Sequence, residues 1–242
     1  MNWKKNNYSK DSFEYKNAIS VLKAYKERHI KLKKATPFFD NLFPQKLYKD
    51  ANNMAGSEDK RFVAKNDYTY KELIKSRRSV REFSDDSVSL KLVKDCVAQA
   101  ITTPSVCNRQ PWKIYLTDNQ TKIKQLLALQ GGFTGYKLPP VLALVTTDLH
   151  CFRGYGERNE GYVDGGLFLM NFLLSLADSN LAACTLNAMQ SNEILSSMCS
   201  LLRVSSSELP IAFVVIGHYS KDYRVASSAR KSVDDICMVR ND

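Results

Sequence analysis

The sequence predicts an α+β fold in which helices flank a central sheet. Two runs of β-branched and apolar residues, at 141–148 (VLALVTTD) and 211–219 (IAFVVIGHY), are typical of buried strands. Helical patterns surround them, but helices and strands do not alternate as strictly as in a βαβ fold. Neither G-x-G-x-x-G nor G-x-x-x-x-G-K-[ST] occurs, which excludes the usual dinucleotide and P-loop routes to nucleotide binding.

The N-terminal part of the chain differs in composition from the rest, and we expect a division into residues 1–68 and 69–242. Apolar residues at near-helical intervals between 12 and 34 predict an amphipathic helix rich in lysine. The aromatic segment 37–44 (PFFDNLFP) is too apolar to be left in water, and residues 51–59 predict a loop. The helix either packs on its own domain or a second subunit, or lies on a membrane surface.

The main domain shows a clear order of elements. Ser89 is a plausible N-cap for one helix, and the pair Gly131-Gly132 closes another. The pattern predicts helices at 70–78, 89–100, 121–129, 162–179 and 191–202, and strands at 112–118, 141–148, 182–187 and 211–219.

The net charge of +10 raises the question of nucleic-acid binding, so its distribution matters. Residues 1–68 hold 15 Lys and Arg against 8 Asp and Glu, a net +7, and the remainder holds 20 against 17, a net +3. Most of the excess lies in the basic extension. We therefore expect no nucleic-acid partner for the main domain.

Other composition features exclude several classes of protein. No stretch approaches the roughly 20 uninterrupted apolar residues of a membrane span, and the polar first residues do not resemble a signal peptide. We expect a cytoplasmic protein that does not enter a membrane. The six cysteines lie far apart, without a C-x-x-C pair or a Cys/His cluster, which argues against a disulfide framework or a metal site and for reduced structural thiols.

The first candidate binding motif is SRRSVREF at 76–83, where a helix gives way to an extended segment. Its cationic cluster consists of Arg77, Arg78 and Arg81. Arg77 and Arg81 can both reach one phosphate, and Ser79 adds a hydroxyl donor, because planar guanidinium groups match phosphate oxygens. The alternative is a solvated cationic helix end that complements the helix dipole.

The second candidate is the loop TPSVCNRQPW at 103–112. Ser105, Asn108 and Gln110 supply short polar groups, and Pro104 stiffens the loop together with Pro111. Such a loop can present amide and hydroxyl groups to the edge of a flat heteroaromatic ring. The alternative is an ordinary helix-to-strand turn, in which Pro and Asn are common.

RRSVREF followed by a P-S-x-x-N-x-Q-P-W loop resembles the flavin-binding signature of the nitroreductase family. The segment from 162 to 187 resembles that family's long central helix, strand and flavin-contacting turn, and ARKSVDDIC resembles its closing basic contact. The resemblance covers about residues 69–242. It implies a nitroreductase-like fold, with a mixed, mainly antiparallel central sheet flanked by helices and, here, a helical extension at the N-terminus.

The resemblance also implies site residues and a cofactor. FMN phosphate contacts would come from Arg77, Ser79, Arg81 and Arg230, with Arg78 in the same cluster. Ring or ribityl contacts would come from the loop, with Pro104, Ser105, Asn108 and Gln110, and from the turn at 186–188, with Leu186 and Asn187. Two subunits of a homodimer would share each flavin. Many relatives have Glu-Gly at the turn, where this chain has Asn187-Ala188.

The implied activity is an FMN-dependent reduction of small organic substrates, such as nitroaromatics or quinones, in a two-step cycle. NADH or NADPH would reduce the flavin, which would then reduce the substrate. No protein acid or base is required, so we assign no catalytic side chain. Two alternatives remain open: a flavin-binding sensor or storage protein without turnover, and an anionic-surface or nucleic-acid binder that works through residues 1–68.

Overall fold

The computed structural model describes residues 9–241. Contacts divide the chain into two compact units. The terminal unit consists of Met1–Glu58 and Ala226–Asp242, and the central unit consists of Asp59–Val225. The domain division expected after residue 68 stays a prediction.

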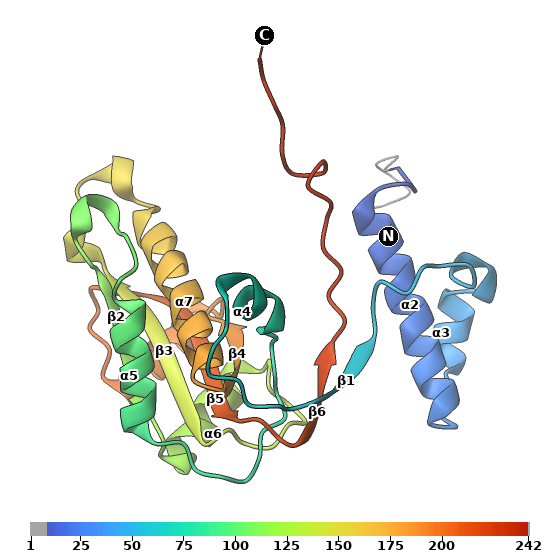
Figure 1. Cartoon of the computed structure of the whole chain (residues 1–242), viewed down its shortest axis with the longest axis horizontal. Coiled ribbons are helices and arrows are strands. Elements are labelled where there is room, and N and C mark those ends of the chain that lie inside the picture. Colours follow the sequence, from blue (N-terminus) through green and yellow to red (C-terminus); the bar gives the residue numbers. More distant parts are fainter. Residues whose placement is uncertain (1–8, 242) are drawn as a thin grey trace. The chain divides into compact units, whose positions relative to one another are not determined.

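The central unit is built on a four-stranded sheet with strand order β2-β3-β5-β4 (Figure 1). Every neighbouring pair in this sheet is antiparallel, and an isolated parallel bridge joins Ser79 to Ala183. The predicted α+β class with a mainly antiparallel sheet is therefore confirmed. The strands are β2 (Trp112–Thr117), β3 (Val141–Asp148), β4 (Leu181–Asn187) and β5 (Glu208–His218).

Helices cover both faces of this sheet because its central strands are apolar on both faces. In β3, Val141, Ala143 and Val145 belong to one buried cluster, and Leu142 and Leu144 belong to the other. The first cluster packs against α5 and α7, and the second contains residues of α6 and α8. The helices of the central unit are α4 (Tyr70–Ser76), α5 (Leu90–Ala100), α6 (Gln120–Gln130), α7 (Glu160–Asp178) and α8 (Asn192–Leu202).

The central helix α7 approaches the sheet closely. A Cβ atom on Gly165 would lie 2.6 Å from Cγ1 of Ile211, so only glycine fits there without rearrangement. Phe168 and Phe172 are fully buried, and the Phe168 ring stacks on Trp112 with ring centroids 5.2 Å apart. This contact fixes the helix over the start of β2, the strand that follows the loop at 103–112.

Local sequence signals set the helix ends as expected. The Ser89 side chain accepts a hydrogen bond from the backbone N–H of Lys91 at the start of α5. Gly131, with φ of 77°, ends α6 in the left-handed conformation. A capping box of Thr69 and Glu72 begins α4. The short α4 therefore has a well-defined start just ahead of the arginines.

The terminal unit contains the helix expected in the extension. Here α2 (Phe13–Lys31) is followed by α3 (Pro37–Leu42), a short helix that the aromatic segment did not suggest. Phe39 is buried and stacks on Tyr25, but Phe38 is 78% exposed. The expectation that this aromatic segment avoids water is thus met only in part within the unit.

Two short strands were not expected from the sequence. β1 (Ser57–Arg61) pairs with β6 (Asp222–Ala226) in a two-stranded sheet. The start of β1 falls within the segment 51–59 that predicted a loop. Its residues, SEDKR, are polar and lack the apolar alternation by which strands are recognised.

Within residues 9–241, no helix has both the length and the apolar character needed to cross a bilayer. The cytoplasmic location stays a prediction.

Candidate functional site

The arginine segment, residues 77–81, lies against the edge strand β4. The backbone leaves α4 at Arg77, and the N–H of Val80 donates to the carbonyl of Ala183 at 2.9 Å. Val80 is fully buried with Ala182 and Val225. This buried valine anchors a segment whose neighbouring residues are polar or charged.

Alternation along the extended segment sorts its side chains onto two sides. Arg77, Ser79 and Arg81 share one side. Burial raises the pKa of the Cys184 thiol in β4, while Arg81, Ser79 and Arg77 all act to lower it. Arg78 points the other way and instead lowers the pKa of Tyr223, which burial raises. The spacing R-x-S-x-R thus brings two guanidinium groups and a hydroxyl to the same strand.

Two of these guanidinium groups have no anionic partner among the residues that the structure describes. Arg77 and Arg81 are half-buried, and neither has an ion pair to a carboxylate within residues 9–241. By contrast, Arg109 pairs with Glu157 at 2.6 Å. Because a partly desolvated charge without a partner is costly, this pair of arginines favours a bound anion.

The end of β4 carries a second unsatisfied group. The hydroxyl of Thr185 is buried and has no hydrogen-bond partner among the described residues. Leu186, next in the strand, is buried, and Asn187 is exposed. The Asn187 carbonyl accepts a hydrogen bond from the Gln130 side chain at 3.2 Å. Sequence reasoning named Leu186 and Asn187 but missed Thr185, because a lone threonine in a strand carries no specific signal.

The loop at 103–112 adopts an unusual backbone. Cys107, Asn108 and Gln110 have φ values of 50°, 54° and 48°, in the left-handed region that non-glycine residues rarely occupy. The Ser105 hydroxyl accepts a hydrogen bond from the Gln110 N–H at 2.9 Å, and the Gln110 side chain donates to that of Asn108 at 3.2 Å. Pro104 is exposed. The predicted polar groups therefore cluster within one tight loop.

Central helix α7 supports this loop through two residues that sequence reasoning missed. The carboxylate of Asp164 accepts the N–H of Val106 at 3.2 Å, and the Asn171 side chain donates to the Thr103 hydroxyl at 2.7 Å. The available signal was the presence of Asp164 and Asn171 inside a mostly apolar helix.

The two predicted motifs do not meet within one chain. The arginine segment lies beside β4 and the loop precedes β2, and these strands are the opposite edges of the sheet. The edge strands β2 and β4 are three inter-strand steps apart, which corresponds to roughly 14 Å. Arg230 belongs to the terminal unit, where its guanidinium donates to the carbonyl of Ser228 at 2.9 Å.

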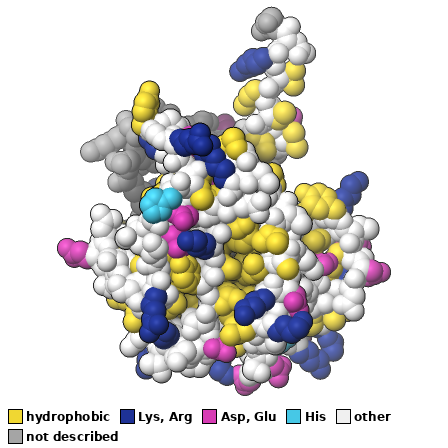
Figure 2. All heavy atoms as spheres, turned by 90° about the vertical axis from the view of Figure 1, so that its left-hand side faces the viewer, with side chains coloured by type: hydrophobic (Ala, Val, Ile, Leu, Met, Phe, Trp, Pro, Cys, Tyr) yellow, Lys and Arg dark blue, Asp and Glu magenta, His cyan; other side chains and the backbone are white. Residues whose placement is uncertain are grey.

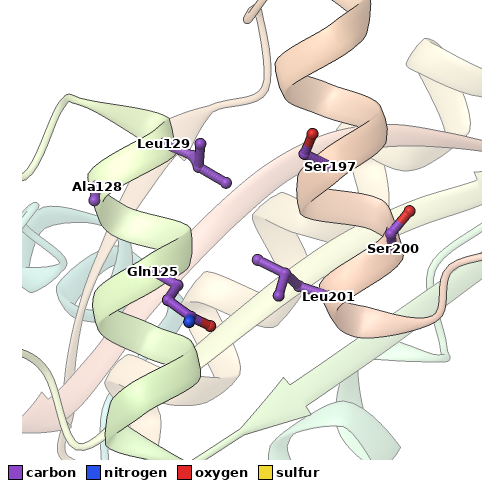
Figure 3. Close-up of a pocket in the computed structure, with 6 residues that line it drawn as sticks. All are labelled: Gln125, Ala128, Leu129, Ser197, Ser200 and Leu201. Atoms are coloured by element: carbon purple, nitrogen blue, oxygen red, sulfur yellow. The ribbon is translucent and has the colours of Figure 1, made fainter.

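A groove elsewhere on the central unit carries none of the predicted residues. It lies between α6 and α8 and has a volume of about 730 Å³ (Figure 3). The residues that line this groove are polar or apolar, and none of them is titratable. They are Gln125, Ala128, Leu129, Ser197, Ser200 and Leu201. We therefore do not place the candidate site there.

The surface charges are mixed on the face that Figure 2 shows. Lys and Arg side chains stand there as separate groups beside Asp, Glu and hydrophobic side chains. This face offers no continuous basic surface of the kind that a phosphate backbone requires. The exclusion of nucleic acid stays a prediction.

Comparison with known proteins agrees with the motifs. The model of the nitroreductase family matches residues 74–134, which include both the arginine segment and the loop. Over this segment the chain is similar to the nitroreductase family. The crystal structure of a Desulfovibrio desulfuricans protein classed as a nitroreductase, in complex with FMN, shares its fold, with a TM-score of 0.61 and 20% identity over 72% of this chain and 98% of that one.

Two relatives of known name align with parts of this chain. Chloronitrobenzene nitroreductase of Comamonas testosteroni is 34% identical over 100 residues, which cover 37% of this chain and 44% of the relative. The chain thus matches less than half the length of that relative. Iodotyrosine deiodinase 1 of Mus musculus is 23% identical over 194 residues, which cover 68% of this chain and 67% of the relative.

Proposed function

We propose that this chain is an FMN-dependent oxidoreductase, similar to the nitroreductases, that uses NADH or NADPH to reduce small organic substrates. The observation that carries the proposal is the arrangement along β4: Arg77 and Arg81 stand on one side with no carboxylate partner in the described part of the chain. An anionic ligand fits such a site.

The residues present suit the different parts of FMN. Arg77, Ser79 and Arg81 would hold the phosphate through charge-assisted hydrogen bonds. The unpartnered hydroxyl of Thr185 and the neighbouring turn at 186–188 would face the polar edge of the ring. When bound, FMN would supply the electron transfer between the nicotinamide donor and the substrate. The protein's part is to bind and orient, and no side chain is assigned as an acid or base.

The separation of the two motifs supports a site shared between two chains. The loop at 103–112 with Ser105, Asn108 and Gln110 lies at the opposite sheet edge from the arginine segment. A loop from a second copy would complete the cofactor contacts. We therefore include a homodimer in the proposal.

Helix α7 offers a surface for this homodimer. Its exposed positions between 161 and 177 are all apolar or glycine, with Tyr162, Val163, Leu167 and Met170 between 43% and 56% exposed. A helix that is apolar on every side is normally buried. In a twofold dimer the same stripe serves both chains, because the interface pairs a surface with itself.

The names of the two relatives suggest a substrate class. Their names point to a chlorinated nitroaromatic and to an iodinated tyrosine, both of which are substituted aromatic rings. We propose a small aromatic substrate that carries a nitro or halogen substituent, which would stack on the flavin.

Spectroscopy and turnover of the purified chain test this proposal. We expect a yellow protein whose chromophore, released by denaturation, is FMN, and which oxidises NADH or NADPH faster than free FMN when a nitroaromatic is added. A colourless protein that does not bind added FMN contradicts the proposal. FMN binding without oxidation of NADH or NADPH would favour a sensor or storage protein.

A further inference from the structure

Helix α7 and the loop at 103–110 are joined at two points with matching spacing. The Asp164 carboxylate accepts the N–H of Val106 at 3.2 and 3.3 Å through its two oxygens, and the Asn171 amide donates to the Thr103 hydroxyl at 2.7 Å. Asp164 and Asn171 are seven residues apart, about two helical turns or roughly 10 Å along one face of the helix. Three residues of extended chain, from Thr103 to Val106, also span roughly 10 Å.

The match in spacing means that the loop runs antiparallel to α7 between two fixed points. Thr103, at one point, is buried, and its own hydroxyl donates to the Ala100 carbonyl at 2.7 Å. The contact at Thr103, the first anchor, thus holds the loop both to α7 and to the end of α5. The second anchor acts at Val106, directly before the three left-handed residues.

Packing alone does not explain why a carboxylate is buried at position 164. Asp164 is only 1% exposed, and among the described residues its hydrogen-bond donor is the backbone N–H of Val106. Burial raises its pKa, and the Val106 N–H and the positive charge of Arg109 oppose that rise. A buried carboxylate with a single neutral donor costs free energy that an apolar residue would not.

The backbone beyond Val106 needs such support. Left-handed conformations at Cys107, Asn108 and Gln110 are strained, and strained residues persist only where the surroundings hold them in place. The N–H of Val106 is fixed by a charged acceptor, which makes a stronger hydrogen bond than a neutral one. The same loop then closes through the bond from the Gln110 N–H to the Ser105 hydroxyl.

We propose that Asp164 and Asn171 are positioning residues that hold the loop in the shape in which Ser105, Asn108 and Gln110 can contact the ligand. This inference rests on the proposed function for the identity of the ligand, which is FMN. The anchoring itself is a property of the ligand-free chain. The two residues act through the loop, Asp164 through the Val106 backbone N–H and Asn171 through the Thr103 hydroxyl.

Hydrogen exchange of the full-length protein tests the anchoring of the loop, and FMN titration separately tests its effect on ligand binding. The variants are Asp164→Ala, Asp164→Asn and Asn171→Ala. Ser175→Ala is the matched control, because the Ser175 hydroxyl bonds to the Asn171 carbonyl within α7 and does not reach the loop. In the flavin-free protein, we expect faster amide exchange in peptides covering 104–110 for the three variants, with unchanged exchange in β3 and β5.

For FMN, we expect the dissociation constant to rise roughly tenfold or more in Asp164→Ala, the size of one lost hydrogen bond to a charged group. Asp164→Asn keeps an acceptor for the Val106 N–H and should recover part of the affinity. Ser175→Ala should match the wild type in both measurements.

The outcomes separate the inference from the proposed function. If the wild type binds no FMN but the loop still exchanges faster in the variants, the cofactor assignment fails and the anchoring stands. If loop exchange and FMN affinity are unchanged in all three variants, the anchoring is wrong. Should Asp164→Ala fail to fold, Asp164→Asn and Asn171→Ala decide the matter. Asp164→Asn keeps the side-chain volume at position 164, and Asn171→Ala leaves the Asp164 carboxylate unchanged.

Discussion

The buried carboxylate of Glu208 permits a prediction with a defined magnitude and pH dependence. Its side chain, at the start of β5, is 1% exposed. It accepts hydrogen bonds from the hydroxyls of Thr146 at 2.5 Å and Tyr115 at 2.7 Å, and from the ammonium of Lys113 at 3.0 Å. Burial alone would raise the pKa of Glu208, but these three donors outweigh it and hold the pKa below the ordinary 4.5.

The substitution Glu208→Gln keeps the shape and removes the charge. A hydrogen bond to a charged group contributes about 1.5–3 kcal/mol, and one between neutral groups about 0.5–1.5 kcal/mol. The glutamine oxygen can still accept from Tyr115, and its amide can donate to Thr146, whose hydroxyl also accepts. With about 1 kcal/mol lost at each of these two bonds, we expect the free energy of unfolding to fall by about 2 kcal/mol near neutral pH.

The difference should depend on pH with a defined sign. Because the folded pKa lies below the unfolded one, the carboxylate stabilises the fold fully above about pH 4.5, and this contribution disappears as the pH falls through the folded pKa. The stability gap between the wild type and Glu208→Gln should therefore shrink at acidic pH. Other acidic groups affect both proteins alike and cancel in the comparison.

Urea unfolding, followed by circular dichroism near pH 7 and below about pH 4, measures this gap. Glu193→Gln, an exposed glutamate at the start of α8, is the matched control and should change stability little at either pH. Equal stability of Glu208→Gln and the wild type near neutral pH would refute the reasoning. A gap that stays constant as the pH falls would show that the charge is not its origin.

Three further substitutions test the site, the fold and the dimer. Arg81→Ala should raise the FMN dissociation constant about 10- to 100-fold in a fluorescence titration, which is the size of one lost charge-assisted contact. The control is Lys75→Ala, which removes an exposed cation in nearby α4 and should leave the dissociation constant unchanged. Gly165→Ala should lower the midpoint of urea unfolding by the equivalent of about 1–3 kcal/mol, because the added methyl group overlaps Ile211; an unchanged midpoint would contradict the close helix–sheet contact. Leu167→Asp should yield a folded monomer in light scattering with weakened FMN binding, and a dimer that survives this change would place the interface elsewhere.

The sequence alone determined most of the local structure of the central unit. Apolar runs such as 141–148 predicted strands because burial on both faces demands continuous hydrophobicity, and Ser89 and Gly131 predicted helix ends because capping is local chemistry. The same holds for the motifs at 76–83 and 103–112, which were recognised from residue types and spacing.

Tertiary structure decided what those motifs can do together. The order of the strands places the arginine segment at β4 and the loop at β2, on opposite edges, and no local pattern encodes strand order. The partner of the Val106 N–H lies 58 residues away at Asp164, and the buried hydroxyl of Thr185 is unsatisfied only because of what surrounds it. Such features arise from contacts between distant segments, which the periodicity of any one segment cannot reveal.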